Sequence, residues 1–468
     1  METLNSYGIS IHDLILKQNE YFETLETRDI SFTTEKLKKL KKGILNREDE
    51  ILTALKKDLG KNPQEAYMME IRSVIEGINF SLKHIRRLAR KKYVPTPLLQ
   101  FGKSKILYEP YGTALIIAPF NYPFSLAIEP LTACLSAGNT AIVKPSELAP
   151  NVAKVVSTLL SEVFEYKYVA SIEGDACITE ELLQEKFDYI FFTGSQRIGK
   201  SVMTAAAKNL TPVTLELGGK SPVIIDSSAD IHTAAKRIIW GKTVNNGQTC
   251  IAPDYVLVPS EKKEELIREM KKVISQFYGT NPEKSQSYGK IVNLRHWKRI
   301  EALIKEDGRF IVHGGNSNEK SLYIEPTILD IPMDKIADAS TMRDEIFAPL
   351  LPVISYEKSE DAVSVVKGFE KPLALYIFSK RKKVIKGLTA VIQSGGVAIN
   401  DTLKHVSIPD LPFGGIGNSG MGAYHGEYGF LTFSHERAVY QNKVSRDLPV
   451  LFPPYNRKNL NIIKKISR

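Results

Sequence analysis

The chain has 468 residues, of which 43% are hydrophobic and 25% are charged, a balance typical of a soluble globular protein with two or three domains. Its net charge of +10 is spread over short basic clusters without interleaved aromatic residues, which argues against a nucleic-acid-binding surface. We interpret most of this charge as solvated surface, with peripheral contact to an anionic membrane as the minority alternative. The clusters lie at residues 36–42, 83–92, 380–386 and 464–468.

The spacing of the cysteines and the length of the apolar segments indicate where in the cell the protein works. The three cysteines, Cys134, Cys177 and Cys250, have no zinc-site or CxxC spacing, so we predict no metal site and a reducing cytoplasm. The first residues lack the pattern of a signal peptide. The longest apolar runs, such as residues 113–120, are too short to span a bilayer, so we expect no transmembrane anchor.

The N-terminal part of the chain has helical periodicity. Residues 10–92 carry apolar side chains at helical spacing, and Pro95 and Pro97 end this pattern. Residues 105–108 and 113–117 then flank a Pro-Tyr-Gly turn, which predicts a β-hairpin.

Strand and helix patterns alternate through most of the remaining chain, which predicts an α/β fold with two tandem domains built on parallel sheets. In the first domain the strands are predicted at 140–144, 167–172, 188–193, 211–216 and 222–226, and the helices at 124–136, 150–164, 178–186, 196–207 and 229–245. In the second the strands are predicted at 255–258, 309–313, 323–329, 351–355, 373–378 and 396–399, and the helices near 261–277, 359–368 and 380–391. Residues from 453 onward are polar and basic, and predict an extended tail.

Cys250 is the first candidate for chemistry. It ends the segment Asn245-Asn246-Gly247-Gln248-Thr249-Cys250, and a loop of small and polar residues suits a nucleophilic cysteine. The alternative is a small core residue, which is the commoner role of an isolated cysteine. Cys134 and Cys177 have no such loop, and we assign them no chemistry.

Two further residues suit acyl chemistry. Glu216 ends an apolar strand just before two glycines, and a carboxylate in such a place needs a partner or a task. Its alternative is a structural ion pair with a nearby lysine. Asn121 lies in a loop between an apolar strand and a helix, where its amide can donate to a developing oxyanion. The alternative for Asn121 is an Asx turn or helix cap.

Nucleotide-binding features follow two predicted strands. Lys144 and Glu147 stand at the end of one strand, where α/β sheets bind nucleotides. Gly194, Ser195 and Gly199 follow another and open a helix whose N-terminus can hold a pyrophosphate. This spacing is neither a GxGxxG fingerprint nor a Walker A motif, so alone it is weak evidence.

Taken together, these segments resemble the aldehyde dehydrogenase superfamily over residues 15 to 455. The matching motifs, in the family's order, are PFNYP at 119–123, KPSE at 144–147, FTGS at 192–195, LELGGKSP at 215–222, GQTC at 247–250, EIFAP at 345–349 and LPFGGIGNSGMG at 411–422. The resemblance is to the class 3 branch, which includes the fatty aldehyde enzymes. This part of it rests on residues 372–376, 424–426 and 433–435 and on the short N-terminus.

The resemblance implies a role for each candidate. It makes Cys250 the nucleophile, Glu216 the general base, and Asn121 with the Cys250 backbone N–H the oxyanion hole. It implies NAD as cofactor, with NADP tolerated, because Glu147 disfavours a 2′-phosphate while Lys144 accommodates one. The residues it assigns to cofactor binding are Lys144, Glu147, Gly194, Ser195, Gly199, Leu217, Gly218, Glu345 and Phe347.

The resemblance also implies the domain plan and the partners. It predicts a Rossmann-like NAD(P)-binding domain, an α/β catalytic domain and a small β element for oligomerisation in a homodimer. Their expected bounds are 1–97 with 111–217, 218–418, and 98–110 with 419–447, followed by a tail at 448–468. The expected substrate is an apolar aldehyde: medium- or long-chain, aromatic or polyene. The alternatives are a CoA-acylating enzyme, disfavoured by Glu216 in its LELGG context, and a non-catalytic member of the fold.

Overall fold

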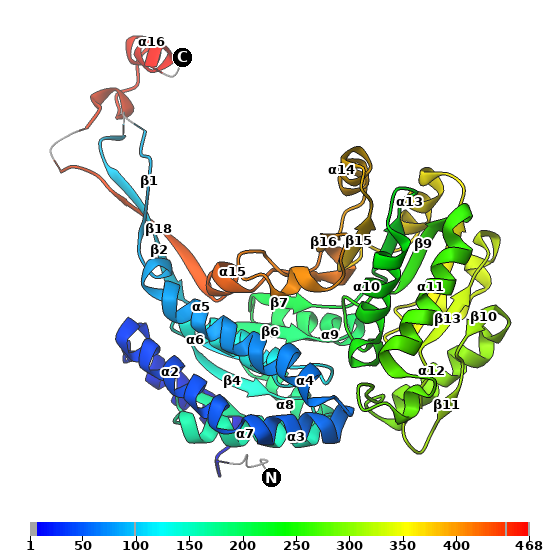
Figure 1. Cartoon of the computed structure of the whole chain (residues 1–468). Helices are drawn as coiled ribbons and strands as arrows, with labels where there is room; N and C mark the ends of the chain where they lie inside the picture. The colour runs from blue at the N-terminus through cyan, green and yellow to red at the C-terminus, as the bar shows by residue number, and fades with distance from the viewer. Residues whose placement is uncertain (1–6, 98–99, 445–446, 467–468) are drawn as a thin grey trace.

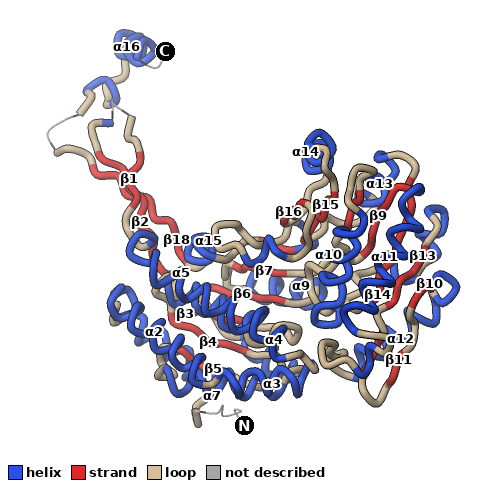
Figure 2. The backbone as a smooth tube through the Cα atoms, viewed as in Figure 1, coloured by secondary structure: helices blue, strands red, loops and turns tan. Residues whose placement is uncertain are grey.

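The computed structural model describes residues 7–97, 100–444 and 447–466, and contains two large parallel sheets and a small antiparallel one (Figures 1 and 2). The α/β fold class with two tandem sheets that is expected from the sequence is confirmed. An arm built on the small sheet projects from the body and carries the C-terminal helix at its end.

The N-terminal segment is helical, as predicted. Its helices are α1 (Ile11–Phe22), α2 (Ile30–Asn46), α3 (Glu48–Leu59), α4 (Pro63–Ala66) and α5 (Arg72–Leu88), with a π-helical segment at Tyr67–Ile71. The side chains that carried the helical period, including Leu37, Leu40 and Ile44, are fully buried. Burial of this apolar stripe explains why a segment rich in lysine folds against the sheet.

The first large sheet has six strands in the order β17-β7-β6-β3-β4-β5, and among the described strands its one antiparallel pair is β17 with β7. The strands are β3 (Thr113–Ile117), β4 (Thr140–Lys144), β5 (Val169–Ser171), β6 (Tyr189–Thr193), β7 (Val213–Glu216) and β17 (Gly420–Met421). The connecting helices are α6 (Ser125–Ser136), α7 (Pro150–Val163), α8 (Ala176–Gln184) and α9 (Gln196–Ala207). Strands β3, β4 and β6 are buried throughout because helices cover both faces of the sheet.

The second large sheet has seven strands in the order β10-β13-β14-β9-β8-β15-β16. The strands are β8 (Pro222–Ile225), β9 (Tyr255–Pro259), β10 (Ile311–His313), β13 (Thr327–Asp330), β14 (Leu350–Tyr356), β15 (Ala374–Phe378) and β16 (Gly396–Ile399). The helices are α10 (Ile231–Thr243), α11 (Ser260–Tyr278), α12 (Leu294–Glu306), α13 (Ser359–Lys367) and α14 (Lys382–Val391).

Two details of this half differ from the sequence prediction. Helix α12 was not predicted, although Trp297, Ile300 and Ile304 recur at helical spacing and are buried. The single strand predicted at 323–329 is two strands, since β12 (Tyr323–Ile324) pairs with β11 (Ser317–Asn318) in a separate ribbon. Pro326 lies between β12 and β13, where a residue without a backbone N–H interrupts strand pairing.

The predicted hairpin around residues 110–112 is wrong. Strand β2 (Lys103–Pro110) pairs with β1 (Lys92–Val94) and β18 (Ser434–Gln441), whereas β3 lies in the core sheet. Gly112 makes the change of sheet, because its φ is +143° and a Cβ there would lie 2.1 Å from an oxygen of Asp188. Asp188 also accepts a hydrogen bond from the backbone N–H of Thr113 (2.8 Å), which ties the start of β3 to the core.

The predicted extended tail is also wrong. Helix α15 (Gly426–Thr432) precedes β18, and residues Arg457–Ile466 form helix α16. Apolar residues repeat at helical spacing among the lysines of this segment, a period that its high polarity hid from the sequence prediction. Among the described helices, none combines the length and the apolar character needed to cross a bilayer.

Candidate active site

Five residues, Leu217 to Ser221, connect the two large sheets, since β7 ends at Glu216 and β8 begins at Pro222. Cys250 follows helix α10 and a short 3-10 turn at Val244–Gly247. Asn121 lies between β3 and α6. The fold therefore brings together three loops that are far apart in the sequence.

The loop before Cys250 is held in an unusual backbone conformation. Asn245, Asn246 and Gly247 all have positive φ angles, of 50°, 54° and 70°. The backbone N–H of Asn245 donates to Oε1 of Glu65 at 2.9 Å. Such strain is stored where surrounding contacts over-determine the chain, which is common at functional sites.

Gln248 fixes the same loop from its other side. Its Oε1 accepts a hydrogen bond from the backbone N–H of Val292 (3.0 Å), and its Nε2 donates to the carbonyls of Asn245 (3.0 Å) and Lys290 (3.1 Å). Because this side chain uses both ends of its amide, the residues before Cys250 have little freedom to move.

Asn121 lies against this loop. Its side chain is buried, and Nδ2 donates to the carbonyl of Gln248 at 3.0 Å. The neighbouring Tyr122 hydroxyl lies 2.7 Å from Oγ1 of Thr249. The Asn121 amide is thus a fixed donor beside the cysteine, and the Asx-turn alternative is not needed to explain its contacts.

Cys250 is half-buried as a residue. Burial raises its pKa, and the nearby carboxylates of Glu345 and Glu216 raise it further. The backbone N–H groups of Cys250 and Ile251 oppose this rise by donating toward the sulfur. These N–H groups therefore point at the place where negative charge forms.

Glu216 is buried without a partner. Its side chain is 3% exposed, and neither carboxylate oxygen has a hydrogen-bond partner among the residues that the structure describes. Burial raises its pKa well above the ordinary carboxyl range. The structural ion pair considered for Glu216 is absent, since Lys220 pairs with Asp254 instead. A buried carboxyl without a partner is a costly feature that is typical of a functional group.

Glu345 lies directly over Gly218. A Cβ on Gly218 would lie 2.0 Å from Oε2 of Glu345, so the glycine is needed for this approach. Burial raises the pKa of Glu345 to about 8, against the effects of the Gly219 N–H and of Lys220. The Lys220 ammonium also donates to the carbonyl of Asp344 at 2.9 Å, which holds the segment that carries Glu345.

Comparison with known proteins identifies this constellation. Residues 10–439 match the model of the aldehyde dehydrogenase family. The chain is 48% identical to the 4,4'-diaponeurosporen-aldehyde dehydrogenase of Staphylococcus aureus over 439 residues. The matched region covers 94% of this chain and 95% of the relative. The chain is also 42% identical over 430 residues to the dimeric NADP-preferring aldehyde dehydrogenase of Rattus norvegicus, covering 92% and 94%. The substrate-bound structure of Staphylococcus aureus AldH matches with a TM-score of 0.95 and 46% identity, covering 98% and 100%.

The chain belongs to the aldehyde dehydrogenase family. It is an oxidoreductase that acts on aldehydes, and its similarity to family 3 members confirms the class 3 resemblance.

The groups expected to hold a dinucleotide lie at the carboxyl ends of strands in the six-stranded sheet. Lys144 ends β4 and its Nζ lies 2.9 Å from a Glu147 oxygen. Ser195 is the N-cap of α9 and accepts from the Ile198 N–H at 3.5 Å. A Cβ on Gly199 would lie 2.7 Å from Leu217, so the helix approaches the connecting loop closely.

The remaining predicted cofactor residues join these groups to the catalytic loops. The backbone N–H of Gly194 donates to the carbonyl of Glu216 at 3.0 Å. Phe347 has a φ of +48°, and its ring lies edge-on to Phe120 with centroids 5.9 Å apart. No cluster of candidate metal ligands exists among the described residues, and the predicted edge suits a nucleotide rather than a metal.

Sequence reasoning missed the ion pairs that support the site. Lys220 and Asp254 are 34 residues apart in the chain and form an ion pair in the interior. Lys220 is part of the LELGGKSP motif, but the sequence alone indicated no role for it. Asp254 also accepts from the backbone N–H of Ile346 at 3.0 Å. A lysine flanked by glycine and serine near an apolar strand was the available signal.

We predict that Gly247→Ala destabilises the Cys250 loop. A Cβ at Gly247 would lie 2.4 Å from the carbonyl oxygen of Ala348, in addition to the positive φ of this residue. The backbone conformation alone costs about 1–2 kcal/mol in a residue with a Cβ. The matched control is Gly8→Ala, where φ is +74° but no atom lies within 4 Å. Thermal unfolding should show a larger loss for Gly247→Ala, and equal losses would contradict the packing argument.

Proposed function

We propose that the enzyme oxidises an apolar aldehyde to its carboxylate with NAD(P), through a thioester on Cys250. The observation that carries this proposal is the buried, unpartnered carboxyl of Glu216 near the Cys250 thiol, together with the Asn121 amide fixed against the same loop. A hydrolytic dehydrogenase needs a base for the second half of its reaction, whereas a CoA-acylating enzyme does not.

The first half of the reaction uses the cysteine loop and Asn121. The Cys250 thiol loses its proton to solvent, and the thiolate forms a C–S bond to the aldehyde carbon, which places the negative charge on the aldehyde oxygen. The Asn121 amide and the Cys250 backbone N–H are the proposed donors to this oxyanion. Each such donor contributes about 3 kcal/mol in comparable sites.

The second half requires activation of water. A bound NAD(P) would supply the hydride acceptor, and loss of hydride from the carbon bonded to Cys250 would leave a thioester on this residue. Glu216 takes a proton from water as the water oxygen bonds to the thioester carbon. The C–S bond then breaks to release the thiolate and the carboxylic acid, which loses its remaining proton to solvent to give the carboxylate. The pKa of Glu216, raised by burial, suits this role, because a carboxylate of higher pKa accepts a proton more readily than an ordinary one.

The proposed cofactor site follows the edge of the six-stranded sheet. Lys144 and Glu147 would hold the adenosine ribose, and Ser195 with the N-terminus of α9 would hold the pyrophosphate. Glu345 and Phe347 would hold the nicotinamide ribose and ring. The carboxylate of Glu147 favours NAD, while the dimeric NADP-preferring relative shows that both cofactors occur in the family.

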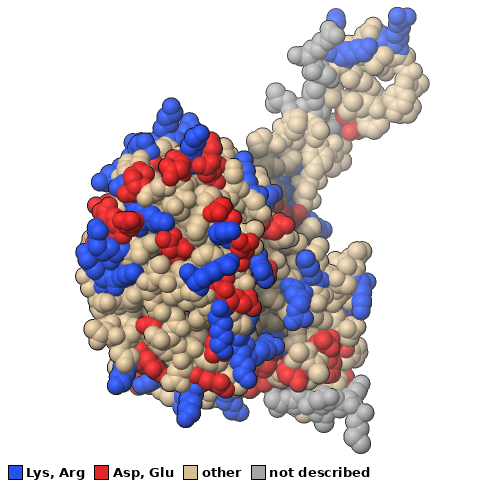
Figure 3. Space-filling view, turned by 90° about the vertical axis from the view of Figure 1, so that its right-hand side faces the viewer, with Lys and Arg blue, Asp and Glu red and all other residues tan. Residues whose placement is uncertain are grey.

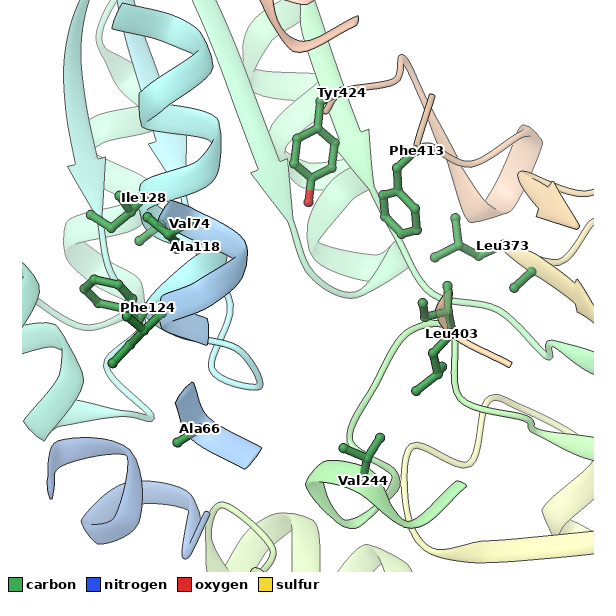
Figure 4. Packing of buried hydrophobic residues seen from close by; sticks show 14 of the residues in the cluster. Ala66, Val74, Ala118, Phe124, Ile128, Val244, Leu373, Leu403, Phe413 and Tyr424 are labelled. Carbon is green, nitrogen blue, oxygen red and sulfur yellow. The ribbon is translucent and has the colours of Figure 1, made fainter. Parts of the chain in front are cut away.

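An apolar cavity supports the proposed substrate class. It lies between α5, α6 and residues 406–426. Most of its surface is apolar, from side chains such as Phe80, Ala133 and Val406, and its lining also includes the polar groups of Glu76, Glu129, Tyr424 and His425. Figure 4 shows the Tyr424 and Phe413 side chains directed toward the same interior space. The Staphylococcus aureus relative is named for a polyene aldehyde, which is apolar and extended.

Assembly and location are part of the same proposal. The arm of β1, β2 and β18 leaves a three-stranded sheet outside the body, with both edges open in one chain (Figure 2). Open edges invite pairing with another chain, which supports a homodimer through this arm. The three free cysteines support a reducing, cytoplasmic compartment.

The first prediction of the proposed function concerns the nucleophile. Wild-type enzyme with NAD should produce NADH from hexanal, decanal, hexadecanal, benzaldehyde or retinal, with kcat/KM highest for extended apolar aldehydes. Cys250→Ala should lower this rate at least 10⁴-fold, an order of magnitude typical of losing a nucleophile. The matched control is Cys177→Ala at an exposed position. Turnover by Cys250→Ala would refute the mechanism, and turnover that requires CoA would favour the acylating alternative.

The second concerns pH. The pKa values of Glu216 and Cys250 are both raised, and the active form of each group is the deprotonated one. Lowering the pH therefore protonates both groups, so we expect kcat for decanal to fall as the pH is lowered from 9 to 6. Glu216→Gln should have a lower kcat with a flatter profile over this range, measured by NADH formation at constant ionic strength. An unchanged profile in Glu216→Gln would contradict the assignment of the base.

The third concerns the end of the arm, for which we propose peripheral contact with an anionic membrane. Exposed apolar side chains there lie beside basic ones in α16, as Figure 3 shows for the Lys and Arg residues. The apolar residues are Leu451, Phe452, Tyr455 and Leu460, and the basic ones are Arg457, Lys458, Lys464 and Lys465. Such a composition suits binding at a lipid interface.

Flotation with liposomes tests this contact. Wild type should bind vesicles containing 30% phosphatidylserine and detach at high salt, since each basic residue near such a surface contributes about 1 kcal/mol. Lys458→Glu/Lys465→Glu should bind several-fold less. Lys382→Glu/Lys383→Glu makes the same charge change in α14 and should bind as wild type. Equal binding by all three proteins would refute the proposed contact.

A further inference from the structure

A buried ion pair lies behind the Asn121 loop, outside the residues assigned to chemistry. Lys61 follows α3, and Glu70 lies in the π-helical segment Tyr67–Ile71. Their side chains are 1% and 0% exposed, and the Lys61 ammonium donates to the Glu70 carboxylate. Taking two charges out of water is costly, so a pair at this depth needs more than their mutual attraction to explain it.

Lys61 also contacts Asn121 and Tyr122, in the turn before α6. Its Nζ donates to the backbone carbonyl of Asn121 at 2.9 Å and lies 4.1 Å from the centre of the Tyr122 ring. The same carbonyl accepts a second hydrogen bond, at 2.7 Å, from Nδ2 of Asn245 in the cysteine loop. Two donors on one carbonyl fix the orientation of the peptide unit after Asn121.

Glu70 holds the other end of the same turn. Its Oε2 accepts hydrogen bonds from the backbone N–H groups of Phe124 (3.1 Å) and Ser125 (3.0 Å), at the start of α6. A carboxylate at a helix N-terminus is favoured by the free N–H groups and the helix dipole. The ion pair therefore holds both ends of the turn from Asn121 to Ser125.

The π-helical segment brings Glu70 to this position. Its five residues replace α-helical geometry between α4 and α5, and such insertions are frequent at functional sites. Glu65 in α4 accepts from the Asn245 N–H, so this N-terminal segment contacts both the cysteine loop and the Asn121 turn.

From this geometry we infer that Lys61 and Glu70 are positioning residues that aim the Asn121 amide at the substrate oxygen. This inference rests on the proposed function, in which Asn121 is an oxyanion donor. Neither residue touches the reacting atoms: they act by fixing the backbone from which the Asn121 side chain projects. A displacement of about 1 Å at a reacting group is enough to cost on the order of 100-fold in rate.

A coupled set of variants tests the inference. Lys61→Met/Glu70→Gln removes both charges together, which avoids leaving one buried charge unpaired. We expect kcat with decanal to fall about 10- to 100-fold while the KM for NAD changes less than two-fold. Asn121→Ala should lower kcat about 100- to 1000-fold. In the Asn121→Ala background the double substitution should cost less than a further two-fold, because its effect passes through the absent amide.

Asp58→Asn is the matched control. Asp58 is a buried carboxylate that caps α7 by accepting from the Val152 N–H at 2.9 Å, and no recorded contact joins it to Asn121. This variant should lower thermal stability and leave kcat within two-fold of wild type. The inference would be overturned if the losses of kcat from Lys61→Met/Glu70→Gln and from Asn121→Ala multiplied in the combined variant. It would also be overturned if a folded Lys61→Met/Glu70→Gln protein kept the kcat of the wild type. An inactive wild type would instead count against the proposed function.

Discussion

The short connection from Glu216 to Pro222 is the constraint on which the rest of the structure depends. It leaves one parallel sheet and enters the other within five residues, so the two sheets meet where Glu216 is buried. Gly218 allows the Glu345 carboxylate to lie against this connection, and Lys220 pairs with Asp254 beneath it. A side chain at Gly218 would separate the loops that carry the candidate base and the cofactor contacts.

Buried charge is distributed unevenly around this connection. Lys61–Glu70 and Lys220–Asp254 are paired and make further hydrogen bonds to backbone groups, so their desolvation is compensated locally. Glu216 has no such compensation among the described residues. The contrast separates charged groups that hold loops in place from Glu216, for which we propose a role in proton transfer. Burial raises the pKa of Glu216 because nothing nearby stabilises its charged form.

Much of the fold and the candidate site could be predicted from sequence because local patterns and motif order carry them. The parallel strands are short, largely apolar runs, and Cys250, Glu216 and Asn121 lie in recognisable motifs. The rest depends on long-range contacts. Residues 105–117 have the local pattern of a hairpin. The backbone conformation of Gly112 and the hydrogen bond from Thr113 to Asp188 instead place the two strands in different sheets. No motif singles out Lys61 or Glu70 in the sequence, because their pairing depends on the packed Asn121 turn.

The thioester on Cys250 is the centre of the account, and trapping it is the most direct test. Glu216→Gln enzyme would be mixed with decanal and NAD for one turnover, quenched in acid, and the protein mass and its proteolytic peptides measured. The account predicts a decanoyl adduct on the peptide that contains Cys250, together with one equivalent of NADH. NADH formation without an adduct on Cys250, or an adduct on another residue, would contradict it.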